Sequence, residues 1–154
     1  SAAEAILNHL SDSELADLCY TRDTFVEATK AQLVAELDLG FNTVRKETVR
    51  MSGINTPESR TRDLDEKRHG LAAKKFLGAL LVGTEKLVIT VKDIGKFGRA
   101  LGVVYADGLN VNFELIDKGY AYPYTGEKKM DYKEMLVRYA AMNDIYKKLE
   151  KGTQ

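Results

Sequence analysis

The spacing of apolar and polar residues changes near residue 20, and the change separates two kinds of predicted structure. Residues 2–19 contain two short amphipathic stretches, and Ser11 with Glu14 has the spacing of a helix capping box. From residue 20 onward the apolar positions favour strands over residues 21–28, 31–37 and 47–53, with a turn at Gly40. We therefore predict an N-terminal helical extension, residues 1–19, followed by a sheet.

The second half of the chain mixes helical and strand patterns. Apolar residues recur at helical spacing over residues 71–81, after a polar loop, 56–65, and Gly83 has the position of a helix C-cap. Residues 87–91 and 100–106 are predicted strands, and residues 111–118 and 130–148 are predicted helices. Because this order lacks the regular alternation of a doubly wound sheet, it predicts an α+β barrel with packed helices over residues 20–150.

Composition narrows the chemistry that such a domain can carry. Basic and acidic residues number 23 each among 154, so net charge gives no sign of a strongly basic nucleic-acid-binding surface. One cysteine and two histidines cannot build an internal disulfide or a soft-ligand zinc cluster, so any metal would have oxygen ligands. Because no apolar run could span a membrane and no signal-peptide pattern begins the chain, we expect a soluble, cytoplasmic protein without a membrane partner.

Two segments place reactive side chains at predicted strand ends. Residues 49–59 read Val-Arg-Met-Ser-Gly-Ile-Asn-Thr-Pro-Glu-Ser, and residues 96–101 read Lys-Phe-Gly-Arg-Ala-Leu. The guanidinium groups of Arg50 and Arg99 could together grip a phosphate, and the Glu58 carboxylate could position water. The pattern predicts chemistry on a phosphodiester.

These segments resemble the staphylococcal nuclease (thermonuclease) family, in which a strand arginine precedes Gly-Ile-Asp-Thr-Pro-Glu and a later Lys-Tyr-Gly-Arg precedes a strand. Residues 38–41, 58–61, 105–108, 111–112 and 118–119 match further elements in the same order, particularly those of phage-like members. The resemblance covers about residues 20–148 and implies an OB-like five-stranded barrel with about three packed helices.

The resemblance also implies roles for individual residues. Arg50 and Arg99 would neutralise the scissile phosphate, while Glu58 would orient or deprotonate the attacking water. Such residues address the DNA or RNA backbone, so little sequence preference is expected. Further substrate-binding candidates, which would flank the backbone or stack a base, are Lys96, Tyr122, Tyr124 and Lys128.

The expected calcium site departs from the family pattern at both of its carboxylate positions. The family's Asp-Gly-Asp-Thr turn aligns with residues 29–32, Thr-Lys-Ala-Gln, so Ala31 stands where the chief acid is expected. The second acid is replaced by Asn55, which leaves its amide oxygen and the backbone carbonyl of Thr56 as candidate ligands. Because lost ligand charge weakens a calcium site, we expect calcium binding and calcium-dependent cleavage to be impaired or absent.

The sequence also allows a repositioned metal site. Asp23-Thr24 could be a remnant of the missing turn if residues are inserted within the predicted hairpin, and other nearby acids are Glu27, Glu36 and Asp38. The sequence is also compatible with two functions. The chain could be a weakened nuclease, or an inactive module that binds nucleic acid, a protein or a small ligand. Residues 1–19 could also hold a protein partner or form a dimer.

Overall fold

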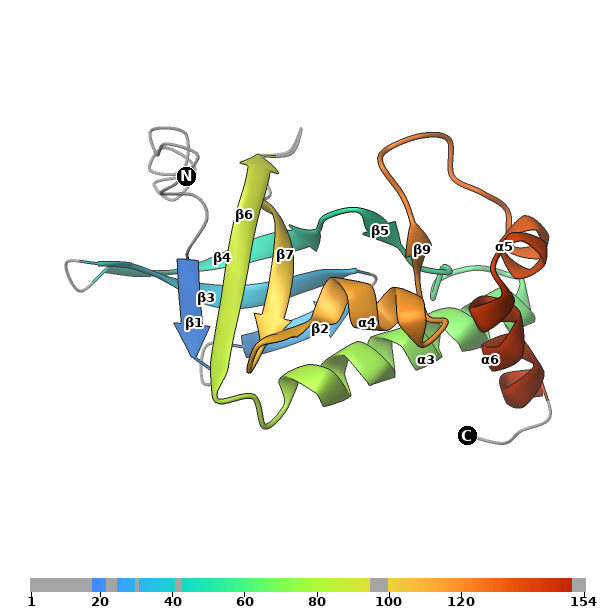
Figure 1. The fold of residues 1–154 in the computed structure, drawn as a ribbon, viewed down its shortest axis with the longest axis horizontal. Coiled ribbons are helices and arrows are strands. Elements are labelled where there is room, and N and C mark those ends of the chain that lie inside the picture. Colours follow the sequence, from blue (N-terminus) through green and yellow to red (C-terminus); the bar gives the residue numbers. More distant parts are fainter. Residues whose placement is uncertain (1–17, 22–24, 30, 41–42, 95–99, 151–154) are drawn as a thin grey trace.

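The computed structural model describes residues 18–21, 25–29, 31–40, 43–94 and 100–150. The main sheet has seven strands, in the order β1-β6-β7-β4-β3-β2 with β8 beside β7 (Figure 1). Their bounds are β1 Leu18–Thr21, β2 Phe25–Thr29, β3 Gln32–Gly40, β4 Thr43–Met51, β6 Lys86–Ile94, β7 Ala100–Ala106 and β8 Leu109–Asn110. Two short strands, β5 Ile54–Asn55 and β9 Tyr122–Pro123, form a separate antiparallel ladder.

The α+β class is confirmed, and the sheet curves as an OB-like fold requires. Neighbouring strands pair antiparallel except β4 and β7, which run parallel and align Arg50 with Leu101. Strand β1 also lies against β3, but no backbone ladder among the described residues joins these two strands into a closed barrel. The sheet is therefore a strongly curved open path with more strands than the expected five.

The described residues form four helices, α3 Leu64–Leu81, α4 Val111–Asp117, α5 Tyr132–Arg138 and α6 Ala140–Glu150. Side-chain oxygens of Asp63, Asn110 and Asp131 cap the first three at their N-termini. The prediction of one helix over 130–148 is wrong, because Tyr139 is extended at φ −119° and ψ 104° and separates α5 from α6. That break lets the Tyr139 ring stack on Tyr122, with centroids 5.9 Å apart. No helix in the described part of the chain has the length and hydropathy of a membrane span.

Two apolar clusters hold the domain together. The larger lies between the sheet and helices α3 and α4, and its buried members include Met51, Leu77, Ile89, Val104 and Leu115. The smaller is aromatic and joins β9 to α5 and α6 through Tyr122, Tyr132, Met135 and Met142. Figure 1 shows α3 running beneath the sheet towards α5 and α6, so the segment between β5 and α3 lies where the two clusters meet.

The N-terminal expectation is only partly within the described structure. Leu18 and Cys19, expected in a helix, instead pair with β6 as part of β1. Residues 1–17 lie outside the described residues, so the extension and its possible partner or dimer stay predictions.

Candidate functional site

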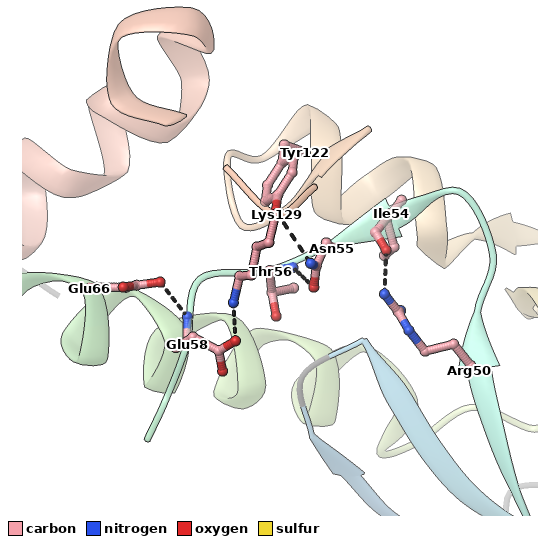
Figure 2. A network of polar contacts seen from close by, with 8 residues as sticks. All are labelled: Arg50, Ile54, Asn55, Thr56, Glu58, Glu66, Tyr122 and Lys129. Carbon is pink, nitrogen blue, oxygen red and sulfur yellow. Dashed lines mark hydrogen bonds and ion pairs between the residues drawn. The ribbon is translucent and has the colours of Figure 1, made fainter. Parts of the chain in front are cut away.

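The candidate site follows the C-terminal end of β4, where the chain passes through β5 into the turn before α3. Pro57 restricts the backbone of this turn, and it is buried together with the two residues before it, Asn55 and Thr56. Strand β9 pairs with β5, so the segment after β9 lies close to the turn that follows β5 (Figure 2). Residues far apart in sequence therefore meet around Thr56 and Glu58.

Arg50 donates hydrogen bonds to three backbone carbonyl groups. Its Nη1 donates to the carbonyl oxygens of Ala31 and Met51, each at 3.0 Å, and its Nη2 donates to that of Ile54 at 2.8 Å. These bonds join the turn before β3 to β5, and Figure 2 shows the side chain reaching Ile54. Arg50 thus fixes the backbone of the site, and a phosphate would have to meet a guanidinium already used in this way.

Ala31 occupies a strained turn position. Its φ is 55°, a left-handed conformation that costs a β-carbon residue about 1–2 kcal/mol. Its carbonyl oxygen accepts the Met51 N–H at 2.7 Å as well as the Arg50 bond, and its side chain is only 1% exposed. The backbone turn is therefore kept, while the methyl group offers no metal ligand.

Asn55 and Thr56 are buried, at 5% and 2% exposure. The Asn55 Oδ1 accepts the Thr56 backbone N–H at 2.9 Å, and its Nδ2 donates to the Tyr122 hydroxyl at 3.3 Å. The Thr56 hydroxyl has no hydrogen-bond partner among the described residues. Asn55 thus ties β5 to β9.

The described residues do not fit the calcium ion that the resemblance implies. They contain no group of three His, Cys, Asp or Glu side chains able to hold a metal. Ala31 carries no ligand atom, and the Asn55 oxygen is turned onto the neighbouring backbone. Hard cations need several oxygen ligands, preferably charged, so we derive no step through calcium.

Glu58 is positioned by helix α3 and by the segment after β9. Its backbone N–H donates to Oε2 of Glu66 at 2.9 Å, and its carboxylate forms an ion pair with the Lys129 ammonium (Figure 2). Gly70 allows the helix to approach, because a β-carbon there would lie 2.6 Å from the Glu58 carbonyl carbon. The Glu58 backbone is consequently fixed, while its side chain keeps 30% exposure.

Sequence reasoning missed three of these contacts. A glycine inside a helical pattern usually has a packing reason, so Gly70 could have been singled out. Glu66 lies three residues after Asp63, a capping-box spacing that begins in the supposed loop 56–65 and extends beyond it, so α3 begins earlier than residue 71. Nothing local distinguishes Lys129 from Lys128, because its ion pair spans 71 residues.

The other predicted substrate-binding residues are placed differently from one another. Tyr122 is 1% exposed within the aromatic cluster, and burial raises its pKa to about 12, so its ring does not offer an open stacking face. Tyr124 is half-buried and lines a cavity of about 350 Å³ with Arg50 and Leu101. Lys128 is exposed beside a second cavity, of about 520 Å³. Lys96 and Arg99 lie outside the described residues.

A buried histidine, His69, connects helix α3 to two other parts of the domain next to the site. Because a carbonyl oxygen only accepts, His69 donates through Nε2 to Gly119 at 2.8 Å and accepts at Nδ1 from the Tyr132 hydroxyl, also at 2.8 Å. Burial lowers the pKa of His69, and the hydrogen bond to Gly119 opposes this shift. His69 precedes Gly70, so the same turn of α3 contacts Glu58 and joins α4 to α5.

The fold and the site together define a class of protein. A curved mixed sheet leads through a parallel strand into an Asn-Thr-Pro-Glu turn, which a central helix holds in place. This is the architecture of an OB-like α+β domain with a carboxylate presented from a rigid turn. The chain belongs to the staphylococcal nuclease family: the family model "Staphylococcal nuclease homologue" matches residues 48–148.

Curated relatives agree with this assignment. A rice protein (Oryza sativa subsp. japonica) named "Probable staphylococcal-like nuclease CAN1" is 33% identical over 81 residues, 53% of this chain and 22% of the relative. The rice "Probable staphylococcal-like nuclease CAN3" is 29% identical over 89 residues, 57% of this chain and 22% of that protein. An uncharacterized protein of Bacillus anthracis is 35% identical over 80 residues, 49% of this chain and 36% of the relative. The matches therefore span well under half the length of these relatives.

Proposed function

We propose that this domain binds the phosphodiester backbone of DNA or RNA and cleaves it slowly, with little sequence preference. The observation that carries the proposal is the fixed turn that presents Glu58 just after the strand bearing Arg50. Family membership over residues 48–148 supports a phosphodiester substrate, and the printed names of the rice relatives support a nuclease. We expect this activity in the cytoplasm.

The role proposed for Glu58 is to orient or deprotonate water. The hydrogen bond of its backbone N–H fixes the point from which the Glu58 side chain extends, so less freedom is lost when the carboxylate orients water, which favours catalysis. Arg50 would stabilise charge on the phosphate, and Arg99, outside the described residues, is proposed as its partner. Backbone-directed contacts of this kind carry no base specificity.

Slow turnover follows from what surrounds these groups. The Lys129 ammonium occupies a Glu58 carboxylate oxygen that would otherwise be open to water. Arg50 already donates to three carbonyl groups, and Ala31 and Asn55 supply no carboxylate for a metal. These same observations favour the second candidate function, a module that binds the backbone without cleaving it.

The test is cleavage of labelled single-stranded DNA, duplex DNA and RNA, each with calcium, magnesium, manganese or chelator. We expect slow cleavage by the parent protein and a loss of about 100-fold in Glu58→Gln, within the usual range for a general base. Glu85→Gln is the matched control, because Glu85 is exposed outside the site. Equal cleavage by parent and Glu58→Gln would contradict the role of Glu58. Binding without cleavage by any sample would identify the binding module.

A second variant asks whether the lost carboxylates limit turnover. Ala31→Asp with Asn55→Asp would place two acids at buried positions, which is costly without a cation. We expect the double variant to be less stable than the parent in chelator, and to gain both thermal stability and cleavage when calcium is added. Failure of calcium to change either quantity would show that this turn no longer forms a metal site.

A further inference from the structure

The ion pair between Lys129 and Glu58 enters the proposed function only as a reason for slow turnover. Both side chains are 30% exposed, so the pair lies at the mouth of the site and not in the core. Figure 2 shows Lys129 reaching past Thr56 towards the Glu58 carboxylate. The pair therefore places a positive charge beside the group proposed to handle water.

The segment that presents Lys129 is anchored at both ends. At its start, the Tyr124 N–H donates to the Gly53 carbonyl oxygen at 2.9 Å. At its end, the Asp131 carboxylate accepts the Glu134 N–H at 2.9 Å and caps α5. A lysine held between two fixed points loses less conformational freedom on binding than one on an open loop.

The surroundings of Lys129 leave room for an anion. It lines the cavity of about 520 Å³, together with Lys128 and Arg138 and with three acidic residues. Each of those acids already accepts a hydrogen bond: Glu127 from Thr125, Asp131 from Glu134 and Glu134 from Arg138. The cavity has no net excess of charge, so an anion would be held by direct contact and not by a long-range field.

We propose that the Lys129 ammonium is the resident cation of this site, and that it binds a backbone phosphate beside Glu58 without a divalent metal. An ammonium has three N–H donors, so Lys129 can contact Glu58 and a phosphate oxygen at the same time. It would offset the repulsion between carboxylate and phosphate, which is one part a metal ion plays in such sites. This inference rests on the proposed function and adds that backbone binding is independent of metal.

The test measures binding of a fluorescent single-stranded DNA oligonucleotide in chelator and in calcium, by anisotropy, with gels to show that the probe stays intact. The variants are Lys129→Met, Lys129→Arg and Lys133→Met, the last being a matched control on exposed Lys133 of α5. Thermal unfolding of each variant verifies that it is folded.

We expect the parent to bind equally well in chelator and in calcium. Lys129→Met should bind about tenfold more weakly, the size of one charge-assisted contact, with a salt dependence smaller by about 0.7 in logarithmic slope. Lys129→Arg should keep most of the affinity, and Lys133→Met should match the parent. Such a pattern would support Lys129 as a direct phosphate contact.

Three results would overturn the inference, and they differ in what they leave standing. Binding only in calcium would keep the proposed function and remove the metal-free site. Binding in chelator that Lys129→Met leaves unchanged would place the phosphate elsewhere. No binding of DNA in either condition, with no cleavage, would remove the proposed function and this inference together.

Discussion

The two regions that helix α3 contacts differ in burial and in how their polar groups are hydrogen-bonded. On one side, His69 is fully buried and both of its ring nitrogens have partners, in Gly119 and Tyr132. On the other side, the turn that carries Glu58 keeps a partly exposed ion pair and a buried Thr56 hydroxyl without a partner among the described residues. Both polar atoms of the His69 ring are therefore satisfied by packed neighbours, whereas the turn of the site combines bonded groups, Arg50 and Asn55, with partial exposure and one unsatisfied hydroxyl.

The largest loss of stability is expected at Gly119, the tightly packed partner of His69. Gly119 has φ +85°, and a β-carbon there would lie 2.2 Å from the Ala141 carbonyl oxygen. Gly119→Ala should therefore reduce the free energy of unfolding by about 3–5 kcal/mol, through strain and displaced backbone. Gly126→Ala, at φ +99° with nothing within 4 Å, is the control for backbone strain alone. Equal losses in urea unfolding would show that packing at Gly119 is unimportant.

The next effect should separate activity from stability. A β-carbon at Gly70 would lie 2.6 Å from the Glu58 carbonyl carbon and oxygen, so Gly70→Ala must move the turn. We expect it to cost about 1–3 kcal/mol of stability and to impair any cleavage or DNA binding in the molecules that remain folded. Gly78→Ala is the control in the same helix, because nothing lies within 4 Å, and it should stabilise by up to about 1 kcal/mol. An unchanged function in folded Gly70→Ala would contradict the proposed support of Glu58.

A smaller effect should appear as pH dependence. Burial lowers the pKa of His69 below its ordinary value of 6.5, so the unfolded chain binds more protons than the folded chain between those two values. Stability contributed by neutral His69 is therefore complete above pH 6.5 and falls as the pH drops towards the lowered pKa. Urea unfolding from neutral to mildly acidic pH should show this loss. The loss should be smaller in His69→Gln, and an identical pH profile in both proteins would exclude His69 as its source.

The smallest effect is expected at the strained turn of the site. Ala31 has φ 55°, which glycine adopts without a β-carbon penalty. Ala31→Gly should change stability by less than about 1 kcal/mol, because relief of strain is offset by the greater freedom of the unfolded chain. Thermal unfolding of the parent and of Ala31→Gly measures this difference in stability. A loss of several kcal/mol would mean that the buried Ala31 methyl contributes more packing than its surroundings indicate.

The fold was predictable to the extent that it depends on local pattern. The apolar pattern located β3, β6 and β7, and the apolar stripe with its C-cap found the end of α3. For β4 it predicted residues 47–53, whereas the strand spans Thr43–Met51. The start of α3 was missed because its first turn is exposed and polar, which resembles a loop unless the Asp63 cap is recognised. The break at Tyr139 was missed because the stacking partner of its ring, Tyr122, lies on another element and leaves no signal in the local sequence.

The site was predictable where one continuous segment carries it. Arg50, Asn55, Thr56 and Glu58 lie within ten residues, and the structure gathers them at one turn. The backbone bonds of Arg50 and the ion pair of Glu58 with Lys129 depend on tertiary pairing, which no spacing in the sequence reveals. The metal and substrate roles of these residues stay predictions.

The most direct test of the account is the cleavage of labelled single-stranded DNA by the parent protein and by Glu58→Gln, in chelator and in calcium. We predict slow cleavage by the parent, similar with and without calcium, and a loss of about 100-fold in Glu58→Gln. Cleavage by Glu58→Gln at the rate of the parent would contradict this prediction, because the fixed turn would then not carry the reaction.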